Sequence, residues 1–151
     1  MRPSLPFRDQ APEAYQNLVR QKRYLKECGL APGLLALVEV RASQINGCAF
    51  CVDQHSREAL EAQEAPRRLQ ALPVWREVPW FSPRERAALA WTEALTQLPA
   101  QRVTEALQAE VSALFPGKEL VDLTHAIALI NAWNRLGVAF LPPLPALEAR
   151  P

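Results

Sequence analysis

The amino-acid sequence predicts an all-α protein of about six to seven helices. Fourteen prolines in 151 residues leave proline-free spans that are rich in Ala, Leu, Glu, Arg and Gln, residue types that favour helices. Proline fits the first turn of a helix and breaks its interior. No strand-like alternation bounded by hairpin turns appears. The prolines that we interpret as boundaries between helices are Pro12, Pro32, Pro66, Pro83, Pro99, Pro116 and Pro142.

The first half of the chain predicts three helices and a short turn. Gly29 is a typical C-terminal cap of a first helix. Asn46-Gly47 separates the second helix from the third, because both residues tolerate positive φ. The predicted ranges are 12–28, 32–45 and 48–63 for the helices and 67–72 for the turn, followed by an irregular stretch over 75–81.

The second half predicts three more helices. Ser82-Pro83-Arg84-Glu85 is the clearest start signal, since it combines an N-cap serine, proline at the first helical position and a capping-box glutamate. Apolar residues from Leu120 to Val138 approximate a helical stripe. The predicted ranges are 82–98, 104–115 and 118–140.

Length and composition indicate one domain over residues 1–151, with segments 1–11 and 141–151 extended. The formal net charge is +1, which gives no reason to expect a nucleic-acid partner. No apolar run is long enough for a membrane span, and the N-terminus lacks the apolar core of a secretory signal. We therefore expect a cytoplasmic protein with no membrane partner, in which cysteines are rarely structural disulfides.

The strongest candidate site is Cys48-Ala49-Phe50-Cys51-Val52-Asp53-Gln54-His55. Cys48 lies where a helix begins, so unpaired backbone N–H groups favour a thiolate there. Cys48 and Cys51 lie about one turn apart on one helix face, close enough for a disulfide. His55 follows Cys51 by four residues and can accept the thiol proton. Thiol redox chemistry is the leading interpretation.

Two other interpretations of the same residues stay open. Cys48, Cys51 and His55 offer three zinc ligands with a fourth position free, although Cys28 and His125 are isolated and supply no second ligand pair. The cysteines are also compatible with inert core residues. The sequence points to no cofactor.

Three segments resemble a known family. They are residues 39–55 around the cysteine pair, residues 81–94, and residues 127–136, in that order along the chain. They are similar to the carboxymuconolactone decarboxylase-like superfamily, and within it to the alkylhydroperoxidase AhpD-like, peroxidase-related branch. Decarboxylase members generally lack the cysteine pair, so the resemblance implies a redox protein rather than a decarboxylase.

The resemblance implies an all-helical homo-oligomer, a trimer or a hexamer, that reduces hydroperoxides. Carried over to this chain, Cys51 is the peroxidatic cysteine, Cys48 the resolving cysteine, and His55 part of a proton relay. The disulfide that forms is reduced by an external dithiol of a lipoyl- or thioredoxin-like kind. The position of Cys48 at a helix start would instead make Cys48 the more acidic thiol. The four-residue spacing between Cys51 and His55 favours Cys51 as the reactive thiol.

The chain departs from the family at the relay carboxylate. The family's relay glutamate lies twelve residues before the first cysteine, where this chain has Ala36. Glu39, three residues further on, and Glu93, in the second matching segment, are the two candidates to replace it. Each is equally compatible with a surface carboxylate. Some members also carry a histidine where this chain has Phe50.

Overall fold

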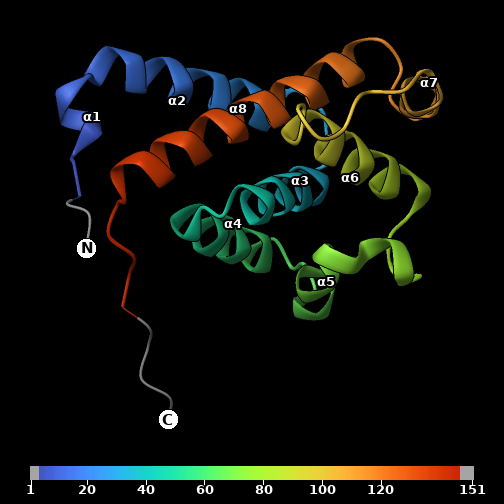
Figure 1. Ribbon diagram of the computed structural model, residues 1–151, viewed down its shortest axis with the longest axis horizontal. Helices are drawn as coiled ribbons and strands as arrows, with labels where there is room; N and C mark the ends of the chain where they lie inside the picture. Colours follow the sequence, from blue (N-terminus) through green and yellow to red (C-terminus); the bar gives the residue numbers. More distant parts are fainter. Residues whose placement is uncertain (1–3, 147–151) are drawn as a thin grey trace.

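The computed structural model describes residues 4–146, which form eight α-helices and one 3-10 helix and contain no strand (Figure 1). The predicted all-α class is thus confirmed, with one more helix than the six to seven expected. The elements are α1 (Phe7–Gln10), α2 (Pro12–Glu27), α3 (Pro32–Asn46), α4 (Ala49–Glu61), α5 (Pro66–Ala71), η1 (Leu72–Glu77), α6 (Pro83–Thr96), α7 (Glu105–Leu114) and α8 (Lys118–Phe140).

The extra helix is α1, and it corrects the prediction that residues 1–11 are extended. Contacts with the far end of the chain explain it: the Phe7 ring stacks on Phe140 with centroids 5.5 Å apart, and the Leu5 N–H donates to the Phe140 carbonyl. A local pattern cannot reveal such contacts. Residues 141–146 contain no helix, as predicted, and residues 1–3 and 147–151 lie outside the described part.

The helix boundaries follow the predicted signals closely. Proline occupies the first turn of α2, α3, α5 and α6, and both hydrogen bonds of the Ser82–Glu85 capping box are formed. Gly47 ends α3 in the left-handed region, with φ of 66°. The start of α4 shifts to Ala49, because Cys48 is its extended N-cap rather than its first helical residue. Helices α4 and α6 each end two residues earlier than predicted, at Glu61 and Thr96.

Helix α3 is the centre of the molecule. It packs against α4, α6 and α8, and its side chains Leu37, Val38 and Ala42 are fully buried. The long helix α8 crosses over α3 and α4 (Figure 1) and also packs against α2. At the turn after α3, Cys48 is buried, whereas its neighbours Gly47 and Ala49 are exposed.

The stretch between α5 and α6 is more regular than predicted. Residues 72–77 form η1, in which Trp75 is buried against the α3 side of the core. No helix within residues 4–146 has the length and apolar character needed to cross a membrane.

Candidate active site

The cysteine pair forms a disulfide between Cys48 and Cys51 at the start of α4. The two Cα atoms are 5.3 Å apart, and both residues are buried. The Cys48 sulfur also caps the helix, because it accepts a hydrogen bond from the Cys51 N–H at 3.3 Å. The extended N-cap conformation of Cys48 thus brings the first sulfur over the first turn of α4, where the second one lies.

Helix α8 approaches the disulfide through Gly137, a buried residue. A methyl group at this position would lie 2.5 Å from the Cys48 sulfur and 3.1 Å from the Cys51 sulfur. The first distance is far below van der Waals contact, and the second is a few tenths of an ångström below it. Glycine is therefore required here, so that the helix backbone can pack directly on the two sulfurs.

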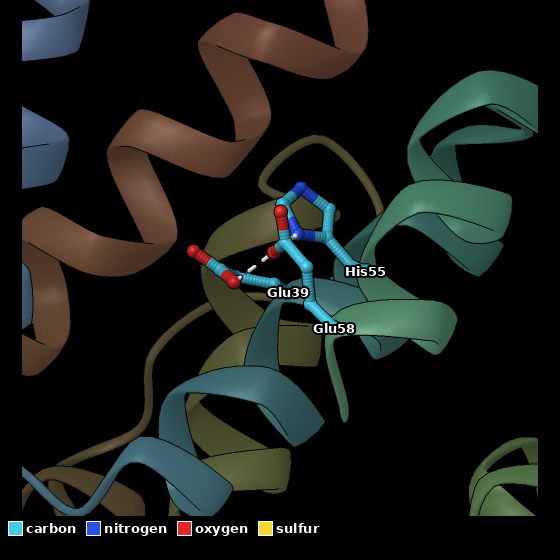
Figure 2. A group of neighbouring side chains, drawn as sticks. All are labelled: Glu39, His55 and Glu58. Carbon is cyan, nitrogen blue, oxygen red and sulfur yellow. Dashed lines mark hydrogen bonds and ion pairs between the residues drawn. The ribbon is translucent and has the colours of Figure 1, made fainter. Parts of the chain in front are cut away.

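His55 lies one turn after Cys51 and contacts two carboxylates (Figure 2). Its Nδ1 atom is 2.9 Å from Oε2 of Glu58, which lies on the same helix, and 3.2 Å from Oε2 of Glu39, which comes from α3. Ionised carboxylates only accept hydrogen bonds, so Nδ1 carries a proton. The second ring nitrogen, Nε2, is left for proton exchange.

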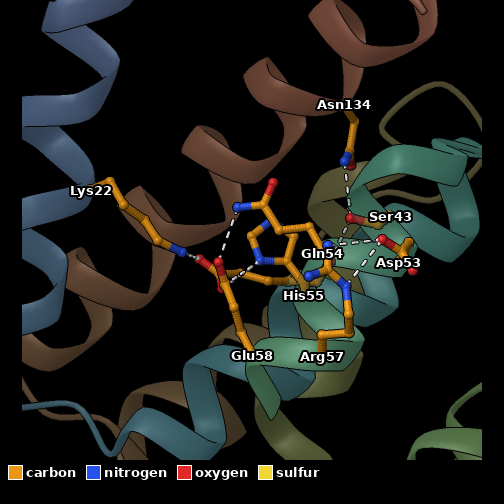
Figure 3. A network of polar contacts seen from close by, with 9 residues as sticks. Lys22, Ser43, Asp53, Gln54, His55, Arg57, Glu58 and Asn134 are labelled. Atoms are coloured by element: carbon orange, nitrogen blue, oxygen red, sulfur yellow. Dashed lines mark hydrogen bonds and ion pairs between the residues drawn. The ribbon is translucent and has the colours of Figure 1, made fainter. Parts of the chain in front are cut away.

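Each carboxylate has a further partner that fixes its position (Figure 3). The Lys22 ammonium, from α2, forms an ion pair with Glu39. The Gln54 amide donates to Oε1 of Glu58 at 3.0 Å. Three helices therefore contribute charged groups to the surroundings of one imidazole.

These contacts shift the pKa values of His55, Glu39 and Glu58 so that each group favours its charged form. Burial lowers the pKa of His55, but the two carboxylates outweigh it and raise the pKa above its usual value. Burial raises the pKa of Glu39, yet the hydrogen bond and charge of His55 and the charge of Lys22 hold it below normal. The hydrogen bond from His55 lowers the pKa of Glu58 to about 2. The arrangement favours an imidazolium between two carboxylates.

Cys51 and His55 line a cavity of about 180 Å³. Its walls include four aromatic side chains, from α1, α2, α4 and α8: Phe7, Tyr15, Phe50 and Trp133. Cys48 does not line it. Of the two cysteines, Cys51 is thus the one that lines the cavity together with His55.

A buried polar network supports the turn that precedes the cysteines. The Asn46 amide donates to the side-chain oxygens of Asn131 and Asn134, at 3.0 and 2.9 Å. The fully buried Asn134 donates in turn to Ser43 Oγ at 2.9 Å (Figure 3). These bonds tie the end of α3 to α8 and fix where α4 begins.

The two predicted relay carboxylates lie in different places. Glu39 contacts His55, as described above. Glu93 is buried on α6, where its oxygens accept hydrogen bonds from Arg41, Trp75 and Arg76 at 2.6 to 3.0 Å. These three contacts give the Glu93 carboxylate a structural role within the core. Ala36, at the position of the family's glutamate, is buried.

The residues considered as metal ligands are also separated. Within residues 4–146, the His, Cys and acidic side chains close enough to share an ion are Glu39, His55 and Glu58, and the group includes neither cysteine. The sulfurs of Cys48 and Cys51 are bonded to each other. Cys28 is a partly buried free thiol, and the exposed His125 contacts the Gln21 side chain.

Three residues of the site were not identified from the sequence. Glu58 follows His55 by three residues, a helical spacing that would have indicated the contact. Gly137 interrupts the apolar stripe of α8, and a glycine inside a helix is a signal of close packing. Lys22 has no such signal, because its contact with Glu39 depends on how α2 packs.

An all-helical fold with a cysteine pair at a helix start agrees with the family that comparison with known proteins identifies. Residues 9–94, more than half of the chain, match the carboxymuconolactone decarboxylase family. The chain belongs to this family, which confirms the resemblance found in the sequence.

Individual relatives extend the match over most of the chain. The uncharacterized protein YdfG of Bacillus subtilis is 36% identical over 129 residues, 85% of this chain and 88% of its own length. YnjA of Escherichia coli, also uncharacterized, is 35% identical over 81% of this chain and 66% of its own length. Protein ATU0492 of Agrobacterium tumefaciens, described as of unknown function and a candidate antioxidant defence protein AhpD, has a similar structure with a TM-score of 0.92, 33% identity and coverage of 97% of this chain and 100% of its own.

Proposed function

We propose that the protein is a thiol-dependent hydroperoxide reductase in which Cys51 attacks the peroxide, Cys48 resolves the intermediate and His55 transfers the proton. The observation that carries the proposal is the cavity that Cys51 and His55 share, with Cys48 already bonded to Cys51. The candidate antioxidant role of the similar ATU0492 protein supports the same class of function.

The catalytic cycle begins with the reduced pair. The Cys51 thiolate attacks the outer oxygen of ROOH, the O–O bond breaks, and Cys51 becomes a sulfenic acid. The alkoxide that leaves takes a proton from the His55 imidazolium and departs as ROH. Cys48 then attacks the Cys51 sulfur, which forms the disulfide and releases water.

An external dithiol restores the reduced pair through a mixed disulfide. The dithiol is oxidised to its own disulfide, and its two protons return to Cys48 and to the Cys51–His55 pair. The net reaction converts ROOH and a dithiol to ROH, water and a disulfide. The aromatic walls of the cavity favour an organic hydroperoxide with an apolar body. A lipoyl- or thioredoxin-like reductant and a homo-oligomeric assembly are part of this proposal.

Substitution of each cysteine tests the assignment. Cys51→Ser is expected to abolish peroxide consumption with a dithiol donor. Cys48→Ser is expected to stop after one peroxide, with a sulfenic acid trapped on Cys51 by a dimedone-type reagent and located by mass spectrometry. Cys28→Ser is the control and should keep full activity.

Two results would contradict the proposal. Full turnover by Cys51→Ser would exclude Cys51 as the peroxidatic residue. Reversible oxidation of the wild-type pair without turnover would identify a redox sensor or a general disulfide oxidoreductase instead of a peroxidase.

A further inference from the structure

The imidazole of His55 has two carboxylate partners, although the residue at the family's glutamate position is alanine. Oε2 of Glu58 lies closer to Nδ1 than Oε2 of Glu39 does, at 2.9 against 3.2 Å. The shorter contact is also an intrahelical one. The missing glutamate is thus replaced from two directions, by α3 and by α4 (Figure 2).

The two carboxylates differ in how freely they can act on the imidazole. Glu39 shares its negative charge with the Lys22 ammonium, which forms an ion pair with it. The second oxygen of Glu58 is bonded to the neutral Gln54 amide. The Lys22 ammonium therefore offsets more of the charge of Glu39, with which it pairs directly, than of the charge of Glu58, on which it acts only through space.

We propose that Glu58 is a positioning residue that, with Glu39, holds His55 as an imidazolium beside Cys51, an inference that rests on the proposed peroxidase function. The imidazolium stabilises the Cys51 thiolate as an ion pair and supplies the proton for the departing alkoxide. A neutral His55 would leave the thiolate without a counter-charge and the alkoxide without a proton donor. Glu58 acts through His55 and does not touch the sulfur chemistry itself.

Charged groups of both signs surround His55. The cations Arg8, from α1, and Lys22, from α2, line the cavity with His55, and the charge of Lys22 opposes a positive charge on the ring. Glu39 and Glu58 line a second groove, of about 660 Å³, which Lys22 also lines. The Glu58 side chain is 42% exposed there, compared with 8% for His55. An isosteric change at Glu58 should therefore be tolerated by the fold.

Glu58→Gln in the full-length reduced protein tests the inference. The pKa of His55, followed by NMR of the ring protons, is expected to fall relative to wild type. His125, the only other histidine, is an internal reference. The pH midpoint of Cys51 alkylation by iodoacetamide is expected to rise, so that the alkylation rate near pH 7 drops about tenfold for a shift of one unit.

Glu61→Gln is the matched control, since Glu61 lies on the same helix and lines the same groove. It should leave both titrations unchanged. Glu58→Asp keeps the charge on a shorter side chain and should restore part of the His55 shift. If Glu58→Gln does not fold, Glu58→Asp, whose shorter side chain weakens the contact with His55, provides the same measurement with a smaller expected fall in the pKa of His55.

Either of two results for Glu58→Gln would overturn the inference. A fall in the alkylation midpoint would mean that Glu58 merely repels the thiolate, and an unchanged His55 pKa would mean that Glu39 alone holds the proton. The titrations need no peroxidase activity. A wild-type protein that fails to consume peroxide would therefore refute the proposed function, while the His55 and Cys51 titrations would still decide the role of Glu58.

Discussion

At the scale of single residues, the chemistry depends on atoms that lie within a few ångströms of the two sulfurs. Cys51 lines the cavity with His55, while the Cys48 sulfur caps α4. Helix-start geometry and the imidazole thus act on different cysteines. The tension between an acidic Cys48 and a reactive Cys51 has a structural basis, because each thiol has its own source of stabilisation.

Gly137 provides a sharp test at this scale. Gly137→Ala is expected to destabilise the protein by about 1–3 kcal/mol, because its methyl group would overlap the Cys48 sulfur and force the helices apart. Urea denaturation followed by circular dichroism measures the effect. In the same experiment Gly33→Ala is the control: nothing lies within 4 Å of its added methyl group, so it should be neutral or slightly stabilising. Equal stability of the two variants would contradict the close packing of α8.

At the scale of elements, each helix of the site is placed by a boundary signal and then by its neighbours. Gly47 is the C-cap of α3, and the next residue, Cys48, is already the N-cap of α4. The asparagine network then fixes this turn against α8. The boundary is local and readable from the sequence, whereas the position of the turn relative to α8 is not.

The capping box of α6 allows a prediction about an element that carries no residue of the site. Ser82→Ala removes the side-chain acceptor for the Glu85 N–H and is expected to lower the free energy of unfolding by about 0.5–2 kcal/mol. The reciprocal bond, from the backbone N–H of residue 82 to Glu85, is kept in this variant. Thr104→Ala, at the N-cap of α7, removes the same kind of single bond, so its cost should be similar. Denaturant midpoints give both values. A loss of cysteine reactivity in Ser82→Ala, beyond the loss of stability, would contradict the separation of α6 from the site.

At the scale of the whole molecule, the sequence predicted the fold well and the site in part. Prolines, Gly47 and the Ser82 capping box marked helix ends, because these signals act on the backbone next to them. Helical spacing predicted that Cys51 and His55 lie on one face of a helix, and both line the same cavity. Helix α1, the Lys22–Glu39 ion pair and the Gly137 contact were missed, because each joins segments that are distant in the chain. The predicted homo-oligomer and the external reductant stay predictions.

Glu93 shows how a buried carboxylate can contribute to the whole fold. It joins α6 to Arg41 of α3 and to Trp75 and Arg76 of η1. Burial raises the pKa of Glu93, but these hydrogen bonds and the charge of Arg41 lower it by more. The pKa of Glu93 is therefore below its usual value. A carboxyl with a lowered folded-state pKa stabilises the protein fully above its unfolded-state pKa. That contribution is lost as the pH falls through the folded-state pKa.

Glu93→Gln should therefore destabilise the protein at pH 7, by on the order of 3 kcal/mol, since it leaves Arg41 without its buried counter-charge. Its stability should depend less on pH than that of wild type. The two curves should begin to approach each other below the usual glutamate pKa of 4.5 and converge below the lowered folded-state pKa of Glu93. Thermal unfolding at a series of pH values measures both effects. Alkylation of Cys51 and the His55 titration should be unchanged in the folded variant, because Glu93 is occupied by other partners. A loss of Cys51 reactivity at full stability would instead assign Glu93 to the relay and displace Glu39 and Glu58 from it.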